Sequence, residues 1–196
     1  MDSYQALSKE QLIDKVKELT IELENVQTEK NKQIEQMSRL DFLTKLNNRS
    51  ELVERLGYET KRATRTKEPL SLVLFDVDDF KAVNDRYGHS FGDKVLTEIA
   101  KIITSSVRIT DIVGRFDGDE FMLILPSCKA ENALTVAEQI RESVELNIFE
   151  DEIRISISGG ICQFNGESTD QLIDASIKLV KQAKQNGQNR IEVSAK

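Results

Sequence analysis

The sequence predicts an α/β protein in which helices pack on a mixed central sheet. Apolar runs with strand composition alternate along the chain with segments whose apolar residues recur every three or four positions, as in amphipathic helices. Two of the strand-like runs, 112–116 and 121–125, flank an acidic turn that contains an Asp-Gly pair, which favours a β-hairpin. Because a hairpin is antiparallel, the sheet contains strands of mixed direction.

The composition is that of a soluble globular protein, with 39% of the 196 residues hydrophobic and 31% charged. The formal net charge is -7 and no basic run is present, so we do not expect a nucleic-acid-binding surface. No stretch approaches the about 20 apolar residues that cross a bilayer, and the N-terminus lacks a signal-peptide pattern. We therefore expect a cytoplasmic chain without a membrane segment. Cys128 and Cys162 have no metal-binding or redox spacing, which predicts reduced thiols.

Residues 1–40 are predicted to form a stalk and residues 41–196 a single globular domain. The segment 9–37 contains neither Gly nor Pro, so it is predicted to be one helix. Its apolar positions alternate four and three apart, as in a coiled-coil seam. Such a seam fits either an amphipathic helix packed on its own domain or a parallel dimer, and the spacing favours the dimer. The seam consists of Leu12, Val16, Leu19, Leu23, Val26, Met37 and Leu40, with polar Lys30 and Gln33 in between.

The elements of the globular domain follow from local signals. An N-cap at Asn47 or Asn48 begins a helix over 50–65, and the apolar run 70–76 is a strand buried on both faces. Asp78 and Asp79 are predicted N-caps of a short helix whose first turn, which contains Lys81, favours phosphate. The later elements are a turn over 88–93, helices over 95–103 and 130–146, a strand over 153–161, a helix over 172–183 and a final strand over 189–193.

Two acidic clusters are candidates for a functional site. One, with Asp76, Asp78 and Asp79, follows the buried strand, and the other is the hairpin tip with Asp119 and Glu120. An acidic hairpin tip is usually a solvated turn, but Asp76 and Asp119 can face each other if their strands are neighbours. Oxygen ligands with little His or Cys nearby suit Mg²⁺ or Mn²⁺. There is no GxxxxGK[ST] loop, so a P-loop enzyme is not expected. Carboxylates that hold metal over a nucleotide, with Lys81 close by, fit the metal-assisted displacement at phosphorus used by polymerases and cyclases.

Four motifs resemble those of the GGDEF-domain diguanylate cyclases. Residues 115–121, RFDGDEF, are similar to the family signature Arg-(Phe/Tyr)-Gly-Gly-(Asp/Glu)-Glu-Phe, and residues 75–93, FDVDDFKAVNDRYGHSFGD, are similar to its second motif almost throughout. Residues 41–49, DFLTKLNNR, resemble its first motif, and residues 156–161, SISGGI, resemble its late strand. By this resemblance, 41–196 is identified as a GGDEF catalytic domain, with a fold related to adenylyl cyclase and polymerase palms.

The resemblance implies a reaction and its metal ligands. The reaction is the condensation of two GTP into cyclic di-GMP with loss of pyrophosphate. Mg²⁺ (or Mn²⁺) would bind the carboxylates of Asp76 and Asp119 and the carbonyl of Val77. Glu120 would bind a second metal or activate the attacking 3′-hydroxyl. Asp119, Glu120 and Lys81 would then be the catalytic residues.

The resemblance also implies a GTP site. Asn84 and Asp93 would bind guanine, since a carboxylate accepts from the N1–H and N2–H donors that adenine does not present, and the pocket would reject ATP by leaving Asp93 unpaired. Lys81 and Lys184 would bind the β- and γ-phosphates. The other implied GTP-binding positions are Phe80, Asp79 and Gly118.

Dimerisation and inhibition are implied as well. Each domain of this family carries one GTP, so two must meet face to face, and a homodimer through the stalk would raise the effective concentration of the second half-site. Arg108 and Asp111 lie in the register of the family's RxxD site, where cyclic di-GMP inhibits by pairing with the Arg and Asp side chains. The alternative is an ion pair at a helix end, and the register favours product inhibition.

Two residues depart from the family pattern. Asp117 replaces the first signature glycine, and its side chain repels substrate, points to solvent or adds a metal ligand. Gln188 replaces a phosphate-binding Arg, which should weaken GTP binding by about 1.5 to 3 kcal/mol, and Arg190 is not assumed to substitute for it. An active cyclase is favoured because the metal, guanine and lysine positions are intact. The alternatives are a degenerate domain that binds GTP or cyclic di-GMP without turnover and, more distantly, a structural coiled-coil adaptor.

Overall fold

The computed structural model describes residues 9, 11–23, 39–149 and 153–194. The chain divides into two compact units, Met1–Ser38 and Arg39–Lys196. Within the described ranges, no helix combines the length and the apolar character needed to span a membrane.

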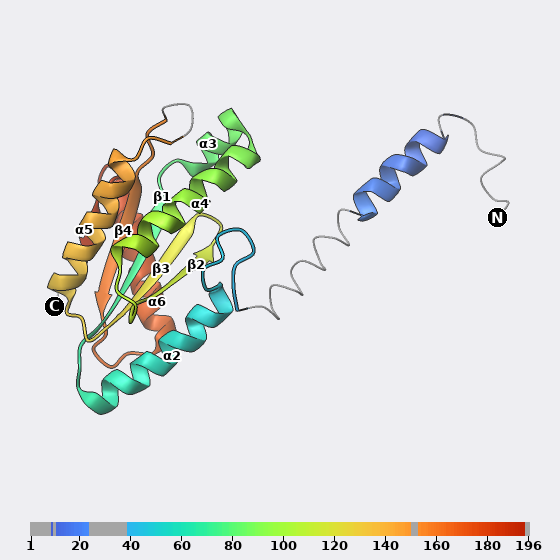
Figure 1. The fold of residues 1–196 in the computed structure, drawn as a ribbon. Coiled ribbons are helices and arrows are strands. Elements are labelled where there is room, and N and C mark those ends of the chain that lie inside the picture. The colour runs from blue at the N-terminus through green and yellow to red at the C-terminus, as the bar shows by residue number, and fades with distance from the viewer. Residues whose placement is uncertain (1–8, 10, 24–38, 150–152, 195–196) are drawn as a thin grey trace. The chain divides into compact units, whose positions relative to one another are not determined.

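The first unit contains a helix over 11–23 (Figure 1). The predicted seam is exposed along this helix, as expected for an apolar stripe that packs on nothing within the described residues of its unit. The exposed seam residues are Leu12, Val16, Leu19 and Leu23. The seam positions from Val26 to Met37 lie outside the described residues.

The described part of the second unit is a five-stranded sheet with helices on both faces (Figure 1). The predicted hairpin over 112–125 is present, and helices are present over 50–65 and 130–146 as predicted. In chain order the elements are α2 (Arg49–Thr66), β1 (Leu70–Val77), α3 (Phe80–Tyr87), α4 (His89–Ser106), β2 (Ile112–Asp117), β3 (Glu120–Pro126), α5 (Ala130–Leu146), β4 (Ile157–Gln163), α6 (Thr169–Gln185) and β5 (Ile191–Val193).

Strand β1 lies at the centre of the sheet, whose strand order is β2-β3-β1-β4-β5. It pairs antiparallel with both β3 and β4, while β4 pairs parallel with β5. Every residue of β1 except Asp76 is buried, as its continuous apolar run predicted. The predicted fold class, a mixed sheet flanked by helices, is thereby confirmed.

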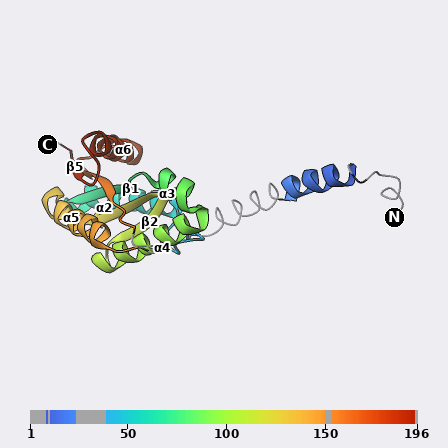
Figure 2. The ribbon, with the colours of Figure 1, turned by 90° about the horizontal axis from the view of Figure 1, so that it is seen from above.

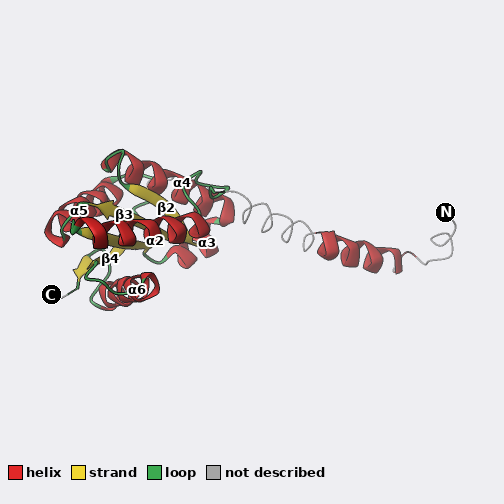
Figure 3. Ribbon diagram, turned by 90° about the horizontal axis from the view of Figure 1, so that it is seen from below, coloured by secondary structure: helices red, strands yellow, loops and turns green. Residues whose placement is uncertain are grey.

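The side chains of β1 alternate between two hydrophobic cores. Val73 and Phe75 belong to the core formed with α4 and α5, whereas Leu72 and Leu74 belong to the core formed with α2 and α6. Figures 2 and 3 show α4 and α6 on opposite sides of the sheet. Each such side chain contributes about 1.5–3 kcal/mol on burial. A one-residue shift of β1 would exchange the two sets, so both cores fix its register.

Two predicted boundaries are wrong. The predicted turn over 88–93 is reduced to Gly88, whose φ of 84° separates α3 from α4, and α4 already begins at His89. Because glycine adopts positive φ readily, one residue turns the chain here. The predicted strand over 153–161 begins only at Ile157 and extends to Gln163, since that is the range over which β4 pairs with β1.

Candidate active site

The end of β1 and the tip of the β2–β3 hairpin lie side by side because β1 and β3 are neighbouring strands. Their register pairs Asp76 with Glu120, and the N–H of Val77 donates to the carbonyl of Asp119 at 3.3 Å. Opposite residues in an antiparallel pair have Cα atoms about 4.5–5.5 Å apart. The two acidic clusters predicted from the sequence therefore meet at one edge of the sheet.

Burial, together with neighbouring negative charge, raises the pKa of two carboxylates at this edge, Asp76 and Glu120. Burial is the main cause that raises the pKa of Asp76; a hydrogen bond from Lys184 opposes it, and the charge of Asp119 adds to it. Burial likewise raises the pKa of Glu120, with further contributions from the charges of Asp76, Asp117 and Asp119. Both carboxylates therefore carry unfavourable negative charge, which a cation bound at this edge would relieve.

The donor atoms at this edge are all oxygens. They come from the carboxylates of Asp76, Asp119 and Glu120 and from the carbonyl of Val77. In the described part of the chain, no three His, Cys, Asp or Glu side chains converge closely enough to hold a metal by themselves. The set fits Mg²⁺ or Mn²⁺, because Mg²⁺ is commonly held by one or two carboxylates together with water and substrate phosphates.

Asp78, predicted to be a helix N-cap, instead anchors the loop after β1 through hydrogen bonds made by its buried side chain. Its buried carboxylate accepts hydrogen bonds from the hydroxyls of Ser156 and Ser158, both at 2.7 Å, and from the N–H of Asn189 at 3.0 Å. Asp79 occupies the cap position of α3 with a φ of 52° and makes no capping hydrogen bond. The cap prediction is therefore wrong for Asp78, whereas Asp79 holds the cap position without the capping hydrogen bond. Three donors from distant segments satisfy Asp78 instead, and such charge-assisted bonds are stronger than neutral ones.

Asn84, one of the two predicted guanine-binding residues, lies where α3 packs on α4, next to the residue that precedes Asp93. Asn84 of α3 lies against Gly92 of α4, where an added Cβ would be 2.0 Å from Asn84 Oδ1 and 3.0 Å from the ring of Phe80. Asp93 follows Gly92 and is exposed. Among the described residues, Asn84 Oδ1 is the buried side-chain polar atom without a hydrogen-bond partner. An unpaired buried acceptor is unfavourable.

The two predicted phosphate-binding lysines differ in their surroundings. Lys81, in the first turn of α3, is exposed. Lys184, in the last turn of α6, donates to the Asp76 carboxylate and, at 3.4 Å, to the carbonyl of Val77. The structure therefore brings Lys184 to two of the predicted metal ligands.

Asp117, which departs from the family signature, points to solvent. Its side chain is 69% exposed, with Oδ2 3.7 Å from Nη1 of Arg49. Its Oδ1 accepts a hydrogen bond from the N–H of Gly118 at 3.0 Å. Of the three orientations considered from the sequence, the structure has the solvent-facing one, although the charge of Asp117 still raises the pKa of Glu120.

Gln188, the second departure, pairs with the loop after β1. Its Nε2 donates to Oδ1 of Asp79 at 3.2 Å. Nη1 of Arg190 donates to the carbonyl of Asn186 at 2.5 Å. Arg190, in the loop after α6, thus binds the C-cap residue of that helix.

The side chain of Arg115 fixes the hairpin tip through contacts that no local sequence pattern predicts. Nε of Arg115 donates to the carbonyl of Gly118 at 2.7 Å, while its Nη1 lies 3.3 Å from Oδ2 of Asp41. Asp41 is buried and also accepts hydrogen bonds from the N–H and the hydroxyl of Thr44. The resemblance identified both segments as motifs, but only the fold brings the buried Asp41 to the arginine of the signature.

Arg108 and Asp111 lie in the turn between α4 and β2. Oδ2 of Asp111 accepts a hydrogen bond from the backbone N–H of Arg108 at 2.9 Å, and the two side chains form no ion pair with each other in the described part of the chain. A groove of about 330 Å³ lies at this turn, and the residues that line it include Arg108, Ile109, Asp111, Leu40 and Lys45. The arginine side chain is thus not engaged by its RxxD partner.

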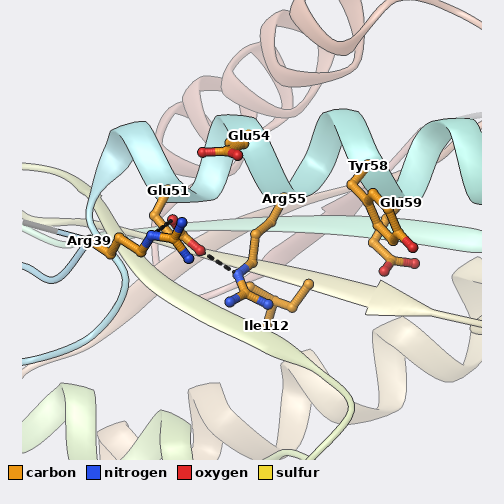
Figure 4. A pocket seen from close by; sticks show the side chains of 7 residues that line it. All are labelled: Arg39, Glu51, Glu54, Arg55, Tyr58, Glu59 and Ile112. Carbon is orange, nitrogen blue, oxygen red and sulfur yellow. Dashed lines mark hydrogen bonds and ion pairs between the residues drawn. The ribbon is translucent and has the colours of Figure 1, made fainter.

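A second pocket, of about 250 Å³, lies beside α2 and contains none of the predicted site residues (Figure 4). At its centre is the buried carboxylate of Glu51, which Nε of Arg55 contacts at 2.7 Å and Nε of Arg39 at 3.5 Å. Because Glu51 already pairs with both arginines, we interpret this pocket as a structural ion-pair cluster that fixes the start of the second unit on α2.

The described fold is a mixed five-stranded sheet flanked by helices, with oxygen donors at the end of its central strand. The chain belongs to the family of the diguanylate cyclase GGDEF domain, which matches residues 38–190. A relative, diguanylate cyclase A of Treponema denticola, is 39% identical over 173 residues, covering 84% of this chain and 46% of the relative. The chain therefore spans about half the length of this relative.

Solved structures give the same assignment. The diguanylate cyclase SiaD from Pseudomonas aeruginosa, in complex with its activator SiaC, has a TM-score of 0.76 at 32% identity, covering 93% of this chain and 72% of that chain. The coiled coil and GGDEF domain of DgcB from Caulobacter crescentus, in complex with c-di-GMP, has a TM-score of 0.78 at 26% identity, covering 93% of this chain and 99% of that chain.

Replacing Glu120 with Gln should raise the melting temperature of the metal-free protein at neutral pH. The pKa of Glu120 is raised in the folded state, so the folded state binds this proton more tightly than the unfolded chain. Stability is therefore lost as the pH rises through the folded pKa, and Gln removes that loss. The gain should be complete once the pH exceeds the raised pKa of Glu120 and should vanish by about pH 3, where both states are protonated.

Thermal unfolding in EDTA at several pH values measures this difference. The matched control is Glu54→Gln, the same change on the exposed face of α2. A Glu120→Gln protein less stable than wild type at neutral pH would mean that the ionised carboxylate makes a favourable native contact, contrary to this account.

Proposed function

We propose that the chain is the catalytic part of a magnesium-dependent diguanylate cyclase, which condenses two GTP into cyclic di-GMP and releases pyrophosphate. The observation that carries this proposal is the pairing of β1 with β3, which sets Asp76 and Val77 beside Asp119 and Glu120. Membership of the family over residues 38–190 supports the same chemistry.

We call the group formed by Asp76, Val77, Asp119 and Glu120 the acidic edge. In this proposal the acidic edge binds the metal and activates the nucleophile. Asp76, Asp119 and the carbonyl of Val77 hold Mg²⁺ or Mn²⁺, which when bound stabilises negative charge at the reacting phosphate. Glu120 accepts the proton of the attacking 3′-hydroxyl or binds a second metal. Its raised pKa suits the first role, because a general base works best when its pKa lies closer to the working pH.

Asn84 and Asp93 select guanine. The carboxylate of Asp93 accepts from the N1–H and N2–H groups of guanine, and Asn84, whose Oδ1 has no partner among the described residues, binds the same base. ATP would leave Asp93 unpaired, and a site built on such hydrogen bonds rejects the wrong base strongly.

The triphosphate is bound by lysines and by the start of α3. Lys81 and Lys184 neutralise the β- and γ-phosphates, and the backbone near Asp79 and Phe80 offers N–H groups at the positive end of the helix dipole. The space beside Gly118 is open, since an added Cβ there would meet nothing within 4 Å, and it leaves room for the triphosphate.

Catalysis requires two copies of the chain. Each domain presents one GTP, and a 3′-hydroxyl reaches the α-phosphorus of the other GTP only when two sites face each other. A homodimer through the coiled coil of residues 1–40 supplies the second site to the catalytic domain 41–196 at high effective concentration. The exposure of Leu12 (40%), Val16 (61%) and Leu19 (46%) leaves an apolar stripe for the partner helix. Because GTP is its substrate, we assign the reaction to the cytoplasm.

Product inhibition is proposed at Arg108 and Asp111. The groove beside them leaves the Arg108 side chain available to a guanine or phosphate of cyclic di-GMP, and the Asp111 carboxylate retains an oxygen for guanine. Bound product there would contact the same turn that leads into β2.

The second candidate function is a domain that binds GTP or cyclic di-GMP without turnover. It is favoured by Asp117 and Gln188, because one adds negative charge near Glu120 and the other pairs with Asp79 where the family has an arginine. Incubation with GTP and Mg²⁺ separates the two functions.

The direct test is chromatography of nucleotides after incubation with GTP and Mg²⁺. Wild type should convert GTP into cyclic di-GMP and pyrophosphate, and EDTA should stop the reaction. Asp76→Asn and Asp119→Asn should lower the rate by about 10³-fold or more, because the lost charge stabilisation is worth several kcal/mol and about 1.4 kcal/mol is tenfold. Asp85→Asn, on the exposed part of α3, is the control. Bound GTP without cyclic dinucleotide would instead support the non-turnover function.

Arg108→Ala should weaken inhibition by added cyclic di-GMP. Losing a charge-assisted contact should raise the concentration that halves the initial rate by about tenfold or more. Lys101→Ala, which removes one positive charge from the exposed face of α4, is the control. Pyrophosphate release measured against added product gives both values. Equal inhibition of wild type and Arg108→Ala would exclude an inhibitory site at this turn.

A further inference from the structure

The ammonium group of Lys184 lies on the acidic edge. It donates to the carboxylate of Asp76 and to the carbonyl of Val77, and its side chain is only 31% exposed. The helix that carries it has little freedom to shift, because an added Cβ on Gly160 of β4 would lie 2.5 Å from the carbonyl oxygen of Ser176 on α6. Movement of this charge must therefore come from the flexible lysine side chain.

The two groups that Lys184 contacts are the ones that the proposed function assigns to the metal. Mg²⁺ requires oxygen ligands at about 2.0–2.1 Å in near-octahedral geometry. An ammonium on the same carboxylate and carbonyl both blocks ligand positions and repels the divalent charge. Lys184 and the metal therefore exclude each other from Asp76 and Val77.

Lys184 also balances the charge of the edge. Its charge lowers the pKa of Asp76 and of Glu120. Burial and neighbouring carboxylates act in the opposite direction and raise both pKa values. An acidic edge with no cation would be unfavourable. In the nucleotide-free protein the ammonium of Lys184 therefore neutralises part of the negative charge that the metal neutralises when it is bound.

We infer that Lys184 is an internal counter-ion that the incoming metal displaces, and that displacement frees it to bind the phosphates. The inference rests on the proposed function, which it deepens. Metal that arrives alone must push the ammonium into water, whereas metal that arrives with GTP offers it a new partner. The site should therefore bind metal and nucleotide with positive coupling, and that coupling runs through one side chain.

Binding of Mn²⁺ tests this inference without turnover. Free Mn²⁺ is measured by electron paramagnetic resonance, first with protein alone and then with 3′-deoxy-GTP, which lacks the attacking hydroxyl and cannot condense. The proteins are wild type, Lys184→Met, Lys184→Arg and the control Lys181→Met, which removes the exposed lysine one turn earlier on α6. Thermal unfolding of each variant verifies that it is folded.

Lys184→Met should bind Mn²⁺ alone about tenfold more tightly than wild type. It should bind 3′-deoxy-GTP with Mn²⁺ about tenfold more weakly. Both factors correspond to the free energy of one partly exposed charged contact. Lys184→Arg, which keeps the charge, should return the affinity for Mn²⁺ alone toward wild type, and Lys181→Met should match wild type in both measurements.

Two results would overturn the inference and are distinguishable. If wild type binds the metal–nucleotide pair but Lys184→Met binds Mn²⁺ alone no more tightly than Lys181→Met, the counter-ion role is wrong and the proposed function stands. If none of the four proteins binds 3′-deoxy-GTP with Mn²⁺, the proposed function fails and the inference fails with it.

Discussion

The antiparallel pairing of β1 with β3 is the interaction on which the site depends. It sets Asp76 opposite Glu120 and joins Val77 to Asp119 by a backbone hydrogen bond. The register is fixed far from the charges, because β1 inserts alternate side chains into two cores and a shift would exchange them. The apolar strand thus holds together carboxylates that would otherwise repel one another. Buried apolar surface stabilises the domain while its acidic edge is left unfavourable, as is common at functional sites.

The loops around the edge are held by buried carboxylates whose donors come from distant segments. Asp78 joins the loop after β1 to the segment before β4 and to the turn after α6. The same turn is tied to α5, where Nη1 of Arg141 donates to Oδ1 of Asn189 at 2.8 Å. On the other side, Asp41 holds Arg115 and through it the hairpin tip. A buried charge of this kind is tolerated only when its hydrogen bonds are satisfied, and it then restricts the geometry of the loop that carries it.

Much of the fold is predictable from the sequence because its signals are local. The apolar run of β1, the Asp-Gly hairpin and the Asn48 cap of α2 each depend on a few adjacent residues, and the structure contains all three. The predicted turn over 88–93 failed because Gly88 alone turns the chain. The role of Asp78 was missed because a carboxylate before a helix resembles a cap, and its true donors, Ser156 and Ser158, become visible only once β4 is paired with β1. The contact of Lys184 with Asp76 likewise depends on α6 packing on the sheet, which no local pattern encodes.

The most direct measurement is a crystal structure of the protein with Mn²⁺ and 3′-deoxy-GTP, with the metal located by its anomalous scattering. The account predicts one Mn²⁺ bound by carboxylate oxygens of both Asp76 and Asp119 beneath the triphosphate, with each metal–oxygen distance close to about 2.2 Å. If the metal binds elsewhere, or if the two carboxylates lie more than about 8 Å apart and so beyond shared coordination, the acidic edge is not the catalytic centre.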